Sequence, residues 1–148
     1  MKKVLSVFVA ITILLVAGQA MAKKVVTPES LDGVTIVNAE WVKKNMGKVM
    51  VFDARKKAEY AESHIPGSIS APYNEKSAKK TDFDPSMDKW DMSVYPKEKN
   101  TPIVIYCNGV KCWKSYKSAT RLIKAGYTNI NWLREGFPGW TSRGYATE

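Results

Sequence analysis

The stretch from Pro102 to Gly126 limits the possible folds more than any other part of this chain. Residues 102–106 read Pro-Ile-Val-Ile-Tyr, which predicts a strand with apolar side chains on both faces. A loop containing a glycine follows, and an amphipathic helix is predicted from about Trp113 to Ala125, where Gly126 ends it. A strand of this kind that leads into a helix is typical of a parallel sheet covered on both faces.

Shorter elements of the same two kinds occupy the rest of the chain. Strands are predicted at 34–37, 48–54, 68–70 and 129–133, helices at 39–44 and 56–62, and a helical turn at 84–90. Strands that alternate with helices predict an α/β fold in three layers, with a central, mostly parallel five-stranded sheet between helices on both faces. The polar segment 76–100 is expected to be a loop insertion near the functional site.

The N-terminus has the pattern of an export signal. Two lysines precede an apolar run from Val4 to Ala17, and an Ala-x-Ala site ends at Ala22. The run is shorter than the roughly 20 residues that a membrane-spanning helix needs. We therefore expect residues 1–22 to be a cleaved signal peptide and residues 23–148 to form a single periplasmic domain without stable membrane insertion. An uncleaved N-terminal anchor is the alternative.

The charge of the chain narrows its possible partners. The whole chain has a net charge of +9, and removal of residues 1–22 leaves 21 basic and 14 acidic residues. A surplus of this sign suits a small anionic substrate or an acidic partner protein. Export argues against nucleic acid, and the lysines occur as scattered pairs rather than as one basic block. We expect a monomer that needs no cofactor.

Cys107 and Cys112 are the only cysteines, five positions apart. A small domain held together by disulfides has more cysteines at wider spacing. Two cysteines and one distant histidine, His64, are also too few ligands for a zinc site, so no metal is expected. Two thiols this close together predict a reactive site.

The position of Cys107 favours a role as nucleophile. It ends the predicted strand, and open α/β folds bind ligands at the carboxyl ends of their strands. Gly109 allows a tight loop of backbone N–H groups, and the next helix directs its positive end towards the sulfur. Lys111 and Lys114 add positive charge nearby. These features are expected to favour a Cys107 thiolate, and an inert buried cysteine is the alternative.

Several separated motifs resemble those of rhodanese-like domains. The opening motifs are Val51–Arg55, Glu59-Tyr60 and Ser63–Ile69, and the later ones are Val104–Cys107, Ala125–Tyr127 and Glu135–Trp140. The resemblance extends from about Thr35 to Tyr145. It implies the rhodanese fold and a sulfurtransferase activity. Cys107 would take sulfane sulfur from an anionic, thiosulfate-like donor as a persulfide and pass it to a thiol or cyanide-like acceptor.

The resemblance also assigns roles to neighbouring residues. The active-site loop would comprise Asn108, Gly109, Val110, Lys111, Cys112 and Trp113. Asp53 and Arg55 match the family's Asp-x-Arg element and are expected to support the site. His64 belongs to a matching turn and is expected to be structural rather than a general base.

The loop departs from the family pattern in two ways. It lacks the arginine common near the loop's end and reads as longer, which leaves the donor open. The missing arginine disfavours an oxyanion-clamping phosphatase or arsenate reductase, whereas the longer loop keeps that alternative open. It also contains Cys112, which either resolves a Cys107 persulfide or sulfenate through a disulfide or is a small apolar residue at the helix start. A thiol–disulfide redox protein or sulfur carrier with a partner protein, and a non-catalytic binding module, are the alternative functions.

Overall fold

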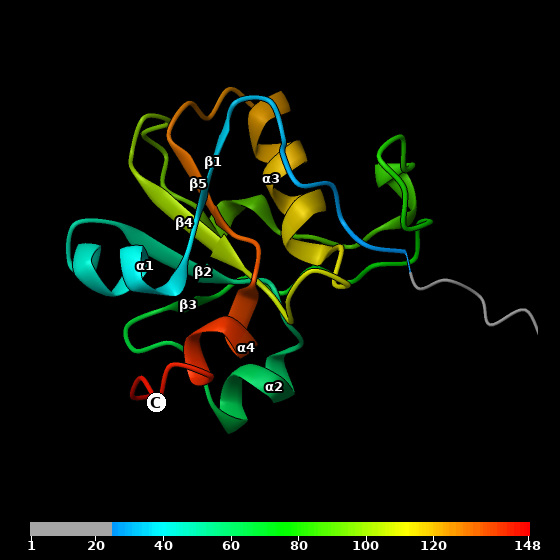
Figure 1. Ribbon diagram of the computed structural model, residues 1–148. Coiled ribbons are helices and arrows are strands. Elements are labelled where there is room, and N and C mark those ends of the chain that lie inside the picture. Colours follow the sequence, from blue (N-terminus) through cyan, green and yellow to red (C-terminus); the bar gives the residue numbers. More distant parts are fainter. Residues whose placement is uncertain (1–24) are drawn as a thin grey trace, which may run out of the picture.

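The computed structural model describes residues 25–148, and the expected signal peptide lies outside this range. The strands are β1 (Val34–Val37), β2 (Met50–Asp53), β3 (Ile69–Ser70), β4 (Ile103–Tyr106) and β5 (Ile130–Leu133). They form one sheet in the order β1-β5-β4-β2-β3, and every neighbouring pair is parallel (Figure 1). The predicted α/β fold with a five-stranded sheet is confirmed, with β4 at the centre of the sheet.

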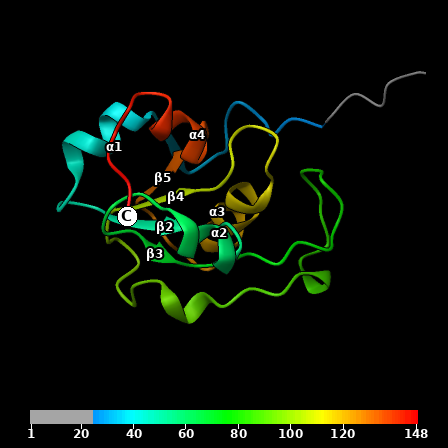
Figure 2. The ribbon, with the colours of Figure 1, turned by 90° about the horizontal axis from the view of Figure 1, so that it is seen from below.

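Helices cover both faces of this sheet. They are α1 (Ala39–Asn45), α2 (Lys57–Glu62), α3 (Lys114–Lys124) and α4 (Gly136–Thr141), and 3-10 turns occupy Pro85–Met87 and Met92–Val94. Seen along the sheet, α1 and α4 lie on one side, and α3 and the polar segment lie on the other (Figure 2). None of the helices within residues 25–148 is long and apolar enough to cross a membrane.

The apolar character of β4 on both faces explains this layering. Ile103 and Ile105 pack into the core beneath α3, whereas Val104 and Tyr106 pack into the core beneath α1 and α4. All four side chains are buried. Successive side chains of a strand point to opposite faces, so a strand without polar positions needs a cover on each side.

The predicted loop insertion is fastened to α3 by a buried ion pair. Lys117 is 0% exposed, and its Nζ lies 2.8 Å from Glu75 Oε2 and donates to Ser77 Oγ at 2.7 Å. Asp88 accepts hydrogen bonds from the Ser77 hydroxyl at 2.6 Å and from the Tyr73 hydroxyl at 2.8 Å. A buried charge is stable only where such partners satisfy it, so this cluster holds the start of the segment against the helix that follows the cysteine loop.

His64 makes the contacts of a structural residue. Its Nδ1 lies 2.8 Å from the carbonyl oxygen of Tyr60, and its ring stacks on the Tyr60 ring with the centroids 3.8 Å apart. Its backbone exchanges hydrogen bonds of 2.7 and 3.0 Å with Glu148. These contacts fasten the C-terminus to the turn after α2, which fits the expected structural role.

Candidate active site

Cys107 follows β4 directly and lies beneath its loop. Its side chain is only 1% exposed. The thiol donates to the carbonyl oxygen of Cys112 at 3.2 Å and lies 2.9 Å from Ser115 Oγ, while the Ser115 N–H donates to Sγ at 3.5 Å. The first turn of α3 therefore directs two groups at this sulfur. Burial nevertheless raises the pKa of Cys107 well above its ordinary value, and the hydrogen bond and charge of Cys112 raise it further, because the two Ser115 groups offset only part of these effects.

Cys112 is the more accessible of the two thiols. Its N–H donates to the carbonyl oxygen of Gly109 at 2.9 Å, which closes the loop into a tight turn. A hydrogen bond from the Cys107 thiol, together with backbone N–H groups and the charge of Lys114, lowers the pKa of Cys112 to about 6. The sequence led us to expect the lowered pKa at Cys107. The structure places it at Cys112, because Cys107 is the more deeply buried sulfur and donates the hydrogen bond.

A cavity of about 320 Å³ opens beside Cys112. It is lined by residues from α2, the polar segment and the cysteine loop: Lys56, Glu59, Glu75, Lys79, Asn108, Lys111, Cys112 and Lys114. Four lysines outnumber two carboxylates, and the carboxylate of Glu59 already accepts a hydrogen bond from Asn108 Nδ2 at 2.6 Å. The surplus of positive charge suits a small anion next to the Cys112 sulfur.

The residues of the predicted loop divide into two groups. Asn108, Lys111 and Cys112 line the cavity, whereas Gly109, Val110 and Trp113 do not. Gly109 has φ +91°, a conformation that side chains rarely adopt, and Trp113 is buried and packs edge-on against the Tyr116 ring. Gly109 and Trp113 therefore set the shape of the loop rather than bind a ligand.

The start of the described chain braces the outside of the loop. The backbone N–H and the hydroxyl of Thr27 both donate to the carbonyl oxygen of Val110 at 2.9 Å. The indole N–H of Trp113 donates to the carbonyl oxygen of Val25 at 3.2 Å, and the Arg134 guanidinium holds the carbonyl oxygen of Thr27 at 2.7 Å. We call these contacts the N-terminal brace. They keep one side of the cysteine loop in place.

The closing motif supports the loop from below. The Phe137 N–H donates to the carbonyl oxygen of Cys107 at 2.8 Å. Gly136 has φ +64°, and a Cβ there would collide with the backbone of Cys107 and Gly109. Only glycine permits so close an approach of the two chains, which explains why the motif has Gly at this position.

Asp53 and Arg55 form a closed network beside the site. Arg55 Nη2 donates to Asp53 Oδ2 at 2.6 Å and to the carbonyl oxygen of Ser63 at 2.6 Å, and the Tyr106 hydroxyl donates to Asp53 Oδ2 at 2.6 Å. The guanidinium also lies 4.0 Å from the centre of the Phe137 ring. Neither Asp53 nor Arg55 lines the cavity. Both act on the site through Tyr106 and Phe137, which fits a supporting role.

Sequence reasoning missed five residues of the site. They are Ser115, which contacts the Cys107 sulfur, and the cavity residues Lys56, Glu59, Glu75 and Lys79. The lysines look like ordinary surface charge in the sequence, and Ser115 looks like one of several polar residues in α3. Within residues 25–148 no group of three or more His, Cys, Asp or Glu side chains is placed to hold a metal ion.

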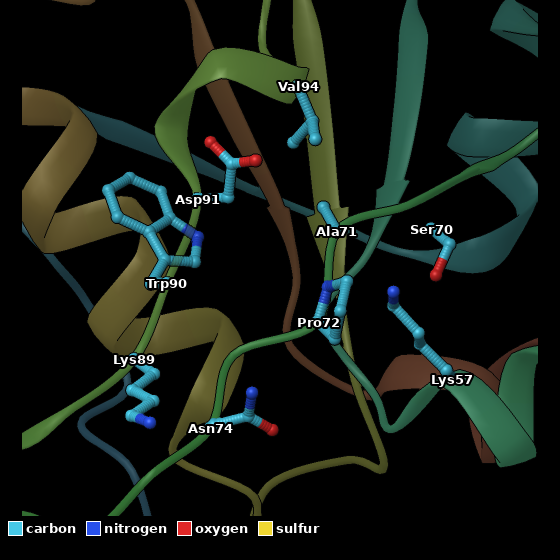
Figure 3. Close-up of a pocket in the computed structure, with 9 residues that line it drawn as sticks. All are labelled: Lys57, Ser70, Ala71, Pro72, Asn74, Lys89, Trp90, Asp91 and Val94. Atoms are coloured by element: carbon cyan, nitrogen blue, oxygen red, sulfur yellow. The ribbon is translucent and has the colours of Figure 1, made fainter.

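A separate cavity of about 360 Å³ lies next to β3 (Figure 3). It is lined by Lys57, Ser70, Ala71, Pro72, Asn74, Lys89, Trp90, Asp91 and Val94. Neither cysteine reaches it, and the neighbouring residues Asn74 and Glu75 line different cavities. We therefore assign the candidate site to the cavity beside Cys112.

Comparisons with known proteins identify the family of this chain. The family model of the rhodanese-like domain matches residues 38–143. Thiosulfate sulfurtransferase 16 from the chloroplast of Arabidopsis thaliana is 26% identical over 97 residues, which cover 66% of this chain and 78% of that protein.

Solved structures show the same fold. The Alr3790 protein from Anabaena sp. matches with a TM-score of 0.58 and 19% identity, over 76% of this chain and 81% of that one. Thiosulfate sulfurtransferase from Pseudomonas aeruginosa matches with a TM-score of 0.57 and 24% identity, over 78% of this chain and 20% of that one. The family model spans most of the chain and includes both cysteines and the Asp53–Arg55 pair. The chain therefore belongs to the rhodanese-like domain family.

Proposed function

We propose that this protein is a periplasmic sulfurtransferase that moves sulfane sulfur from a small, thiosulfate-like anion to a thiol or cyanide-like acceptor through a Cys107 persulfide. One observation carries the proposal. The Cys107 thiol lies at the carboxyl end of the central strand and contacts the carbonyl oxygen of Cys112 and the first turn of α3, and the Cys112 side chain of the same loop lines a cavity with four lysines. Sulfur chemistry on an anion needs these two components side by side.

The lysines supply the binding energy for the donor. Lys56, Lys79, Lys111 and Lys114 line one cavity and outnumber its carboxylates. A divalent anion such as thiosulfate enters with its sulfonate oxygens towards the lysines and its outer sulfur towards Cys112 and Cys107. Exposed charges of this kind are screened by salt, so donor affinity falls as ionic strength rises.

The thiol pair prepares the nucleophile. At neutral pH Cys112 is the thiolate and Cys107 is the thiol, and the two share a hydrogen bond. Transfer of the Cys107 proton to Cys112 produces a Cys107 thiolate, which the Ser115 N–H and hydroxyl stabilise. Because Cys107 is buried, the Cys112 side chain must move aside to admit the outer sulfur of the donor.

The transfer itself is a displacement at sulfur. The Cys107 thiolate forms a bond to the outer sulfur of the donor, the sulfur–sulfur bond of thiosulfate breaks, and sulfite leaves with the electron pair. An acceptor thiolate or cyanide then attacks the outer sulfur of the persulfide and restores the Cys107 thiolate. The name of the Arabidopsis relative, thiosulfate sulfurtransferase 16, supports thiosulfate as the first donor to test.

Intact mass spectrometry tests the proposal directly. The reduced protein is exposed briefly to thiosulfate, and Cys107→Ser is treated in parallel. We expect the protein to gain one sulfur atom, and this gain should require Cys107. Cyanide should remove the added sulfur as thiocyanate. Where Cys112 reacts with the persulfide, as described below, the added sulfur is released instead. A protein that releases no sulfite from thiosulfate and takes up no sulfur, both as the wild type and as Cys112→Ser, would contradict the proposal. Fractionation of expressing cells tests the periplasmic location. Recovery of the protein in the cytoplasm with residues 1–22 still attached would contradict it.

A further inference from the structure

We propose that the cysteine pair adds a second activity, in which Cys112 resolves the Cys107 persulfide, releases the transferred sulfur as sulfide and leaves a Cys107–Cys112 disulfide. The protein would then work as a dithiol-dependent, sulfide-releasing reductase of its sulfur donor. This inference rests on the proposed function, because it begins from the Cys107 persulfide.

The proximity of the two cysteines is the first observation. The Cys107 thiol donates to the carbonyl oxygen of Cys112 at 3.2 Å, and the interaction of the two side chains is the largest cause of the lowered pKa of Cys112. The turn closed by the Cys112 N–H and the carbonyl oxygen of Gly109 brings the two residues together within one loop. A persulfide formed on Cys107 therefore has a second thiol beside its inner sulfur.

The unequal surroundings of the two thiols are the second observation. Cys107 is 1% exposed, whereas Cys112 lines the cavity through which an acceptor arrives. The lowered pKa of Cys112 keeps it a thiolate at neutral pH, and the thiolate is the form that attacks a sulfur–sulfur bond. An external acceptor has to pass Cys112 before it reaches the persulfide. The intramolecular reaction at Cys112 therefore has the advantage of proximity.

The proposed step balances without any further reactant. The Cys112 thiolate attacks Cys107 Sγ in the protonated persulfide, the bond between the two cysteine sulfurs forms, and the bond from Cys107 Sγ to the outer sulfur breaks. The outer sulfur leaves as hydrosulfide with the electron pair and its proton. Two electrons pass from the cysteines to the sulfane sulfur. A reduced dithiol, small or protein-borne, then reopens the disulfide by thiol–disulfide exchange, and its own oxidation balances the cycle.

A single-turnover experiment without added reductant tests the inference. The pre-reduced protein, Cys112→Ser and Cys107→Ser are each mixed with thiosulfate, and sulfide, sulfite and intact mass are measured together. We expect the wild-type protein to release one sulfide per chain and to lose two hydrogen atoms as it forms the disulfide. Addition of a dithiol should then restart sulfide release. Cys112→Ser should release sulfite, keep one extra sulfur and release no sulfide.

The other outcomes separate this inference from the proposed function. A wild-type protein that keeps its persulfide and releases no sulfide overturns the inference and leaves the sulfurtransferase intact. A wild-type protein that releases no sulfite, together with a Cys112→Ser variant that takes up no sulfur, overturns the proposed function itself. A stable persulfide on Cys112 in Cys107→Ser overturns the order of the two cysteines. Cys112→Ala provides a second variant, so that a folding defect of one substitution does not decide the result.

Discussion

Two polar clusters lie at the ends of the neighbouring strands β2 and β4, and they differ in whether they border the cavity beside Cys112. Asp53 at the end of β2 pairs in register with Tyr106 at the end of β4, and Cys107 is the next residue. The Asp53–Arg55 network is closed, because its ion pair is buried and each charged group has several partners. The cysteine loop instead opens to a cavity, which the Cys112 side chain lines together with four lysines from the loop and its neighbouring segments. The contrast indicates that one cluster holds the frame and the other performs the chemistry.

The largest effect is expected at the nucleophile. Cys107→Ser keeps the size of the side chain but removes the sulfur that carries the persulfide, so sulfur transfer to cyanide should fall by a factor on the order of 10³ or more. The free energy of unfolding, measured in urea, should change by less than about 1 kcal/mol. A variant that keeps activity would make Cys112 the carrier and reverse the roles within the loop.

Breaking the Asp53–Arg55 network should lower the stability of the fold far more than it lowers the rate of sulfur transfer. Arg55→Met leaves the Asp53 carboxylate buried without its cation, and such a change costs about 3–5 kcal/mol. Urea unfolding measures the loss, and activity per folded molecule is the matched readout. The double variant Asp53→Asn with Arg55→Met should regain part of the stability. A variant of normal stability whose donor turnover is abolished would instead place Arg55 in the chemistry.

The pH dependence of alkylation sharpens the difference between the two thiols. In Cys107→Ser the remaining thiol, Cys112, should still react with iodoacetamide at a rate that rises with pH, since only the thiolate attacks. With Cys107 in place, the midpoint for Cys112 should lie near its pKa of about 6. In Cys107→Ala, which removes the largest cause of the lowered pKa, the midpoint should move up towards that of an ordinary thiol, about 8.5. Peptide mapping assigns the label, and an unchanged midpoint would show that Cys107 does not tune Cys112.

The smallest effect is expected at the rim of the cavity. Lys111→Gln removes one of four lysines from an exposed position, so the KM for thiosulfate should rise by a few-fold with little change in kcat. The effect should shrink as salt is added. Lys48→Gln, at an exposed position outside this cavity, is the matched control. An equal effect of the two substitutions would show that overall charge, rather than the cavity, binds the donor.

Local patterns in the sequence were enough to predict the fold. The apolar run at 103–106, the glycine at 126 and the alternation of strands and helices place the five strands and helices α1, α2 and α3 within a residue or two of their observed bounds, whereas the helical turn expected at 84–90 spans only Pro85–Met87. The position of Cys107 at the end of the central strand followed from the same reasoning. The surroundings of the thiols did not, because they depend on Ser115, on residues of α2 and on the polar segment, which only the folded chain brings together.

The buried Lys117 cluster shows the same limit of sequence reasoning. A lysine in a helix normally indicates a solvent-facing position. Lys117 is fully buried because Glu75, Ser77 and Asp88 contact it from the polar segment, which precedes α3 in the chain. The sequence pattern of α3 alone carries no information on partners so far away in the chain. The segment 76–100 is therefore predicted only as a loop insertion.

The N-terminal brace makes the order of folding events matter. The bond from Thr27 to Val110 joins residues 83 positions apart. Contacts of such long range carry a large loop-closure entropy and tend to slow folding. A chain that emerges N-terminus first must complete both β4 and the cysteine loop before Thr27 finds its acceptor. The cysteine loop therefore has to be in place before the N-terminal brace can fasten it.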